Sequence, residues 1–256
     1  MSIFPLSILV AVAFFTTAIM YLKQNVNSYL DIVALLMVLG GTLSVGMMTL
    51  PWDLRKDLKL ALQKLWKKTG PSYQSALEDC LATMKGQVPT ATEGQLHRRI
   101  LLDGVELLSL GVPTERLQKI LEERVHQYGR RQKKVANSLR SLAKYPPAFG
   151  LMGTVLGLVN VMNGVSKGLS GKQTAFEMAL ALVATMYGLV LANLVLNPAG
   201  ELIQKKASDE EDLGHMAVQT LMLMAQNTSL LEAQETLNSY APEEQQLHLN
   251  SAGLET

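Results

Sequence analysis

Two apolar stretches of this 256-residue chain each carry one threonine and no charged residue: PPAFGLMGTVLGLVNVMNGV with Thr154, and ALALVATMYGLVLANLVLNP with Thr185. A hydroxyl donates or accepts hydrogen bonds and lends an oxygen to a cation, but it carries no charge. Ion relays inside membranes need an ionisable group. The pair therefore suggests the wall of an ion path whose charged group comes from another chain. The plainer alternative is that each hydroxyl bonds a carbonyl one turn back.

The composition indicates a membrane protein, with 48% hydrophobic and 18% charged residues. Four uncharged stretches are each long enough to cross the roughly 30 Å hydrocarbon layer: residues 1–22, 32–52, 145–166 and 178–200. The first has no Lys or Arg before Lys23 and no small-residue cleavage pattern, so we interpret it as a retained helix. The sequence predicts an all-α integral membrane protein with four transmembrane helices and a helical cytoplasmic domain.

Charge is distributed unevenly along the chain. Residues 53–144 hold 18 basic and 10 acidic side chains, whereas residues 200–256 hold two lysines against ten acids. Basic residues beside the spans favour the cytoplasmic side, so both termini and the large loop are predicted to be cytoplasmic. The predicted domains are residues 1–52 (first two spans), 53–144 (cytoplasmic helices), 145–200 (last two spans) and 201–256 (cytoplasmic tail).

Several functional classes find no support in the sequence. Cys80 is the only cysteine, and the four histidines, His97, His126, His215 and His248, show no metal-ligand spacing. Phosphate loops, nucleophile elbows and dinucleotide fingerprints are absent. Basic residues alternate with acids at helical spacing, which is unlike a nucleic-acid surface. We therefore expect no enzyme activity, no bound metal and no nucleic-acid partner.

Helical periodicity extends beyond the spans. Residues 53–68 form either a basic interfacial helix or a continuation of the second span, and residues 72–85, 95–110 and 113–144 read as further helices. Pro146 and Pro147 should bend or interrupt the chain before the third span. After Pro198 we expect a polar helical tail, with the acidic run 209–212 as a solvated face.

Gly150 and Gly188 share a helix face with the threonines, and Gly153 and Gly157 form a pair on an adjacent face, which favours close contact between the spans. The helix-packing candidates are Gly150, Gly153, Gly157 and Gly188. The acids nearest to the spans, Asp31 and Glu177, lie at their edges. The chain therefore either packs against a partner with a buried acid or is no ion device.

The third and fourth spans together, PPAFGLMGTVLGLVNVM followed by ALALVATMYGLVLANLVLNPAGELIQK, resemble the paired signature of the MotA/PomA flagellar stator subunits. These belong to the wider group that includes the TolQ and ExbB energisers. The resemblance is strong over residues 145–205 and looser through the cytoplasmic loop. Four predicted spans favour MotA/PomA over TolQ/ExbB, whose members have three.

The resemblance implies a homo-pentamer, embedded in inner-membrane lipid, around two copies of a single-span MotB/PomB-like subunit whose Asp carries the ion. Thr154 and Thr185 would face the channel, Asp31 would lie near its outer mouth, and Pro147 would couple ion passage to movement. Threonine at both positions is similar to the sodium-type pattern, although H⁺ remains open. No cofactor is implied beyond the transported Na⁺ or H⁺.

The family also drives a rotor switch-ring protein through a charged patch in the cytoplasmic loop. Lys85 and Glu93 match that patch, whereas Met84 and Thr92 stand where charges are common. Arg98 and Arg99 are candidates to supply the charge that is missing at these two positions. Two alternatives stay open: a TolQ/ExbB-like energiser of an outer-membrane system, and a non-conducting helical membrane scaffold.

Overall fold

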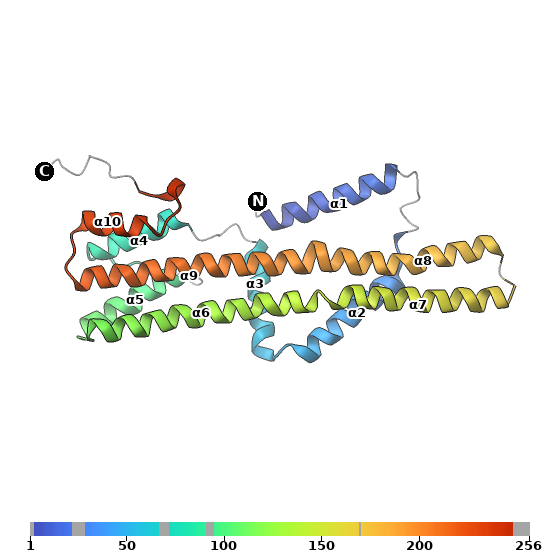
Figure 1. Ribbon diagram of the computed structural model, residues 1–256, viewed down its shortest axis with the longest axis horizontal. Helices are drawn as coiled ribbons and strands as arrows, with labels where there is room; N and C mark the ends of the chain where they lie inside the picture. Colours follow the sequence, from blue (N-terminus) through green and yellow to red (C-terminus); the bar gives the residue numbers. More distant parts are fainter. Residues whose placement is uncertain (1–2, 22–28, 67–71, 91–94, 169, 248–256) are drawn as a thin grey trace. The chain divides into compact units, whose positions relative to one another are not determined.

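The computed structural model describes residues 3–21, 29–66, 72–90, 95–168 and 170–247, and in these ranges it contains helices but no strand (Figure 1). The elements are α1 (Ile3–Tyr21), α2 (Ile32–Thr49), α3 (Trp52–Trp66), α4 (Tyr73–Met84), α5 (Leu96–Ser109), α6 (Thr114–Leu142), α7 (Tyr145–Ser166), α8 (Gly171–Val190), the π-helix η2 (Leu191–Leu196), α9 (Asn197–Ala225), α10 (Leu230–Asn238) and the short η3 (Glu243–Gln245). The predicted all-α class is confirmed.

Three helical stretches of the described chain are long and apolar enough to cross a membrane: Ile32–Thr49, Thr114–Ser166 and Gly171–Ala225. The first covers residues 32–49 of the second predicted span, and the other two contain the third and fourth predicted spans. Helix α1 has 19 residues and no charged side chain, which corresponds to a length of about 28 Å, but it is not among the three. The first span, and with it the number four, stays a prediction.

The chain divides into two compact units, which differ from the four predicted segments. The first unit comprises residues 1–68 and 134–204, and the second comprises residues 69–133 and 205–256. The difference arises because the expected polar tail is amphipathic. Leu213, Met216 and Leu221 of α9 are fully or almost fully buried among residues of the long loop between the second and third predicted spans.

In the first unit, α3 is a separate helix and not a continuation of α2. Leu50 and Pro51 interrupt the helical backbone, and Arg55 donates hydrogen bonds to the carbonyls of Leu50 and Met47 that the end of α2 leaves unpaired. The apolar face of α3 packs through Ala61 and Leu65 against α6 and α9, where it meets Val135, Ala136, Leu139, Ala199 and Ile203.

Helices α7 and α8 lie side by side (Figure 1) and approach unusually closely. A Cβ at Gly188 would lie 2.4 Å from the carbonyl oxygen of Pro146, and one at Gly150 would lie 2.7 Å from that of Ala184. Gly153 and Gly157 face the methyl groups of Ala184 and Ala181. Any side chain at these positions would push the two backbones apart.

Prolines shape both ends of this helix pair. Pro146 and Pro147 occupy the first turn of α7 after a break at residues 143–144. Backbone N–H groups in the first turn have no acceptor within the helix, so proline costs no hydrogen bond there. Pro198 instead follows the π-helix η2, in which the Asn197 N–H donates to the Ala192 carbonyl five residues back. A proline removes one regular helical bond and crowds the carbonyl four residues earlier, so the wider π turn accommodates it.

The second unit is built around a core from α4, α5, α6, α9 and α10. Its fully buried side chains include Leu77, Cys80, Leu101, Leu117, Leu121, Leu221 and Leu237. Gly104 allows α5 to approach Leu221, since a Cβ there would lie 2.0 Å from the Leu221 Cδ1. Burial raises the pKa of the Cys80 thiol to about 12.

The acidic run at the start of this part of α9 is not simply solvated, contrary to the expectation from sequence. Tyr128 donates a hydrogen bond to Glu210, and Lys133 pairs with Glu211 at 2.7 Å. Burial, together with the negative charges of Asp212 and Asp209, raises the pKa of Tyr73 to about 12. The partners come from α4 and α6, which sequence periodicity could not place beside this run.

We predict that Gly188→Ala destabilises the first unit by about 1–3 kcal/mol, the usual cost of overpacking, because its Cβ meets the Pro146 carbonyl. Gly40→Ala is the matched control, since a Cβ at Gly40 has nothing within 4 Å. The measurement is the thermal unfolding midpoint of the detergent-solubilised chain. Equal midpoints for the two variants would disprove the close approach.

Leu221→Ala should destabilise the second unit by about 2–5 kcal/mol because it opens a cavity in the core. Cys80, the only cysteine, is fully buried, so its labelling by a maleimide reports opening of this unit. Since 1.4 kcal/mol is a factor of ten, labelling should accelerate at least about 30-fold. Leu110→Ala, at a residue 71% exposed, should leave the rate nearly unchanged, and equal rates would contradict the assigned core.

Candidate functional site

Thr154 of α7 and Thr185 of α8 face each other inside the helix pair. Their hydroxyl oxygens lie 2.5 Å apart. The Thr154 hydroxyl is also 3.2 Å from the Gly150 carbonyl oxygen and 3.1 Å from that of Ala181, and the Thr185 hydroxyl is 3.2 Å from the Gly150 carbonyl oxygen. The two threonines therefore lie side by side at the contact between α7 and α8.

This arrangement contains the plain structural role considered from sequence, together with a contact between the two helices. Thr154 reaches the carbonyl one turn back, as the plain structural role requires, but Thr185 reaches across to Gly150 of the other helix. Two hydroxyls have only two protons for these contacts, and each keeps acceptor lone pairs. The pair can therefore rotate to donate toward an anion or to offer oxygen to a cation.

A groove opens beside the threonines. It has a volume of about 610 Å³ and is lined by Leu151, Thr154, Leu182, Thr185, Met186, Leu189, Val190, Asn193 and Leu194. Leu151 and Leu182 are each 61% exposed and Leu189 is 48% exposed, so the groove lies on the surface of the helix pair. Among the described residues, no ionisable side chain lines it.

Asn193 is a polar lining residue that the sequence analysis missed. Its signal was available, because Thr185, Leu189 and Asn193 follow one another at intervals of four, which places them on one helix face. Asn193 lies within η2, and π-turns inside helices are frequent at functional sites.

The other predicted site residues of the first unit do not line the groove. Pro147 is half-buried, with its Cα against Gly188. Asp31 caps α2 by accepting hydrogen bonds from the backbone N–H groups of Val33 and Ala34. The Asp31 N–H donates to the Tyr187 hydroxyl at 3.2 Å, so α2 begins beside the half of α8 that contains Thr185.

The predicted rotor-contact residues belong to the second unit. Lys85, at the end of α4, and Arg99 are exposed. Arg98 instead pairs with Asp79 through contacts of 2.6 and 3.3 Å, and Asp79 also lies 3.2 Å from the imidazole of His97. Burial lowers the pKa of His97. Glu93 lies outside the described residues.

The sequence of the chain is similar to that of known membrane proteins. The model of the MotA/TolQ/ExbB proton channel family matches residues 92–216. The chain is 24% identical over 217 residues to chemotaxis protein PomA of Vibrio alginolyticus, covering 83% of this chain and 84% of that protein. It is 23% identical over 234 residues to motility protein A of Cereibacter sphaeroides, covering 89% and 90%.

Solved structures share the fold. The C. jejuni MotAB structure matches with a TM-score of 0.84 at 16% identity and covers 94% of this chain and 96% of that chain. The flagellar MotAB stator complex of Bacillus subtilis matches with a TM-score of 0.79 at 17% identity and the same coverage. Together with the sequence matches, these findings confirm the resemblance of the chain to the MotA/PomA flagellar stator subunits.

Proposed function

We propose that this chain is the A subunit of a flagellar motor stator in the bacterial inner membrane, where it forms an ion path with a single-span B subunit and converts ion-motive force into torque. One observation carries the proposal: the groove presents paired hydroxyls and one amide on an apolar wall without an ionisable group. Similarity to PomA over 83% of the chain and to motility protein A over 89% supports the same role.

The mechanism assigns the charge to the partner. An acid inside hydrocarbon is costly unless it is neutralised or paired, so a partner carboxylate in this groove would alternate between cation-bound and hydrogen-bonded states. The hydroxyls of Thr154 and Thr185 would donate to the carboxylate when the cation has left. Asn193 adds an amide that serves as donor and acceptor.

We propose Na⁺ as the coupling ion. The groove supplies neutral oxygen atoms, which suit a hard cation that must bind and leave. The direct test is swimming speed as a function of sodium concentration, with a protonophore as control. Speed that follows sodium and resists the protonophore supports Na⁺, whereas sodium-independent speed that collapses with the protonophore assigns H⁺.

The remaining assembly is proposed from charge, exposure and the resemblance to the stator subunits. We place both termini and the second unit in the cytoplasm because basic residues flank the spans, and the resemblance implies five copies of the chain around two B subunits. Lys85 and Arg99 would contact the rotor switch-ring protein, because both are exposed. Arg98 would act indirectly, since Asp79 already binds it. Single surface ion pairs are weak, so the contact relies on repetition around the ring.

Thr185→Val removes the hydroxyl while preserving the branched shape, and Thr185→Ser keeps the hydroxyl. We predict that the valine variant assembles but loses most sodium-dependent swimming speed, and that the serine variant retains most of it. The measurement is swimming speed across a sodium series at equal amounts of membrane-inserted protein. Equal curves for both variants would remove the hydroxyl from the ion path.

Pro147 tests the coupling step separately. Its Cα lies 2.9 Å from where a Cβ on Gly188 would stand, so a larger residue at 147 should change how α7 begins against α8. We expect Pro147→Leu to insert and assemble but to stop motility. Val159→Leu, at an exposed position of α7 outside the groove, is the control and should preserve swimming; normal swimming of Pro147→Leu would refute a coupling role.

A further inference from the structure

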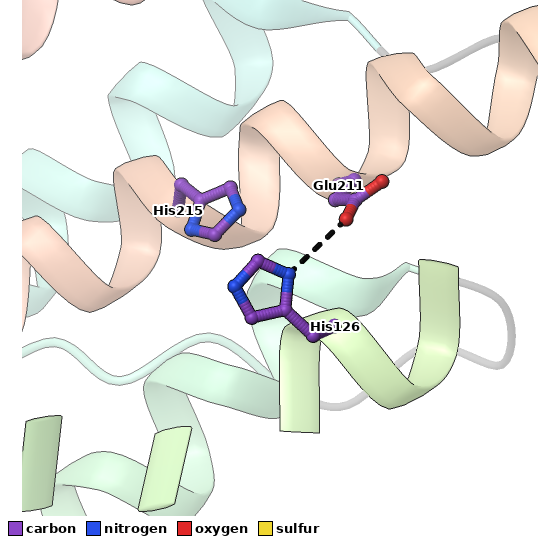
Figure 2. A group of neighbouring side chains, drawn as sticks. All are labelled: His126, Glu211 and His215. Atoms are coloured by element: carbon purple, nitrogen blue, oxygen red, sulfur yellow. Dashed lines mark hydrogen bonds and ion pairs between the residues drawn. The ribbon is translucent and has the colours of Figure 1, made fainter. Parts of the chain in front are cut away.

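Two histidines and a glutamate from different helices meet in the second unit. Figure 2 shows His126 of α6 opposite Glu211 and His215 of α9. One potential ligand atom of each lies within 4.8 Å of the other two. The imidazole rings of His126 and His215 are 5.2 Å apart at an angle of 64°, and His126 Nδ1 lies 3.4 Å from Glu211 Oε1.

The helices are shaped to hold this group. Glu211 and His215 are separated by four residues and therefore lie one above the other on α9. Gly129 of α6 leaves space for the carboxylate, since a Cβ at that position would lie 2.7 Å from Glu211 Cδ and Oε2. The backbone of α6 can therefore approach Glu211 while His126, three residues earlier, faces the same carboxylate.

Glu211 has its two oxygens divided between two partners. Lys133 Nζ lies 2.7 Å from Oε2, whereas Oε1 points toward His126. Burial raises the pKa of Glu211, but the hydrogen bonds from Lys133 and His126 outweigh it and leave the pKa below its usual value. The group is therefore an oriented anion, with one oxygen held by an outer partner, as metal-binding carboxylates commonly are.

The cluster is also accessible and adjoins free space. The His126 side chain is 51% exposed and that of Glu211 is 14% exposed. His215 lines a cavity of about 350 Å³ together with polar residues that include Glu122, Asp212 and Gln219. Water molecules in this cavity could complete the coordination of an ion held by the three side chains.

We propose that His126, Glu211 and His215 form a binding site for a divalent transition-metal ion, with Zn²⁺ as the representative cation. Two imidazoles and one carboxylate are ligands that suit Zn²⁺ and its first-row neighbours, whereas Mg²⁺ and Ca²⁺ favour oxygen alone. Ligand bonds of about 2.0–2.2 Å require a rotation that draws the three ligand atoms together. The ion replaces the contact between His126 and Glu211 Oε1, and Lys133 keeps Oε2.

Such an ion would cross-link α6 to α9 within the second unit. Because it binds the folded arrangement and not the separated helices, it should raise the stability of that unit as its concentration rises above the dissociation constant. This site is independent of the groove in the first unit, so its failure would leave the proposed stator role untouched.

The test uses the full chain, purified in detergent through a tag without histidines and stripped with a chelator. Isothermal titration with Zn²⁺ alone should give one saturable site per chain, and Co²⁺ should give the visible absorption bands of nitrogen and oxygen coordination. His126→Ala and His215→Ala should each weaken Zn²⁺ binding at least about tenfold. His248→Ala is the matched control and should bind like the unaltered chain.

A second readout guards against variants that merely unfold. Zn²⁺ should slow maleimide labelling of Cys80 in the unaltered chain and in His248→Ala, but not in His126→Ala. Glu211→Gln keeps the shape of the side chain without its charge, and it should also lose affinity. Absence of saturable Zn²⁺ binding to the unaltered chain would overturn the proposed site. So would a Zn²⁺ affinity in His126→Ala and His215→Ala equal to that of the unaltered chain.

Discussion

Each of the hydroxyls of Thr154 and Thr185 finds a partner on the facing helix, and this pairing requires the backbones of α7 and α8 almost to touch. Glycine supplies that proximity, because a Cβ at Gly150 or Gly188 would collide with backbone atoms. Polar groups in hydrocarbon must be satisfied within the protein. The same contact that satisfies the hydroxyls places them at the edge of the groove, where a third helix can reach them.

The absence of charge in the groove explains why the proposed function needs a partner. Asp31 uses its carboxylate to cap α2 and does not line the groove. A wall of hydroxyls and an amide can stabilise an ion on a neighbouring carboxylate without holding the ion permanently. In the second unit, one face of α9 contributes apolar residues to the core. The acidic run on its other face stabilises the fold through contacts with Tyr128 and Lys133.

Much of the first unit could be predicted from sequence, because helical periodicity and small residues act locally. The facing of Thr154 and Thr185 and the break before Pro146 follow from such signals.

The π-helix before Pro198 was missed because a proline inside an apolar run indicates a helix end as readily as a wider turn. The group formed by His126, Glu211 and His215 was missed because it joins residues 85 positions apart in the chain, and periodicity does not say which helices become neighbours. The amphipathic face of α9 could have been recognised, since Leu213, Met216 and Leu221 recur at helical spacing.

The central claim is that a partner helix carrying an acid occupies the groove, and cross-linking from the groove tests it most directly. A photoreactive residue at Leu189, in the groove, is compared in living cells with one at Leu36 of α2, which is 65% exposed and outside the groove. The account predicts that position 189 captures a single-span protein through a peptide whose apolar span contains Asp or Glu, and that position 36 does not. Capture of lipid alone at position 189, or of the same partner equally from both positions, would contradict the account.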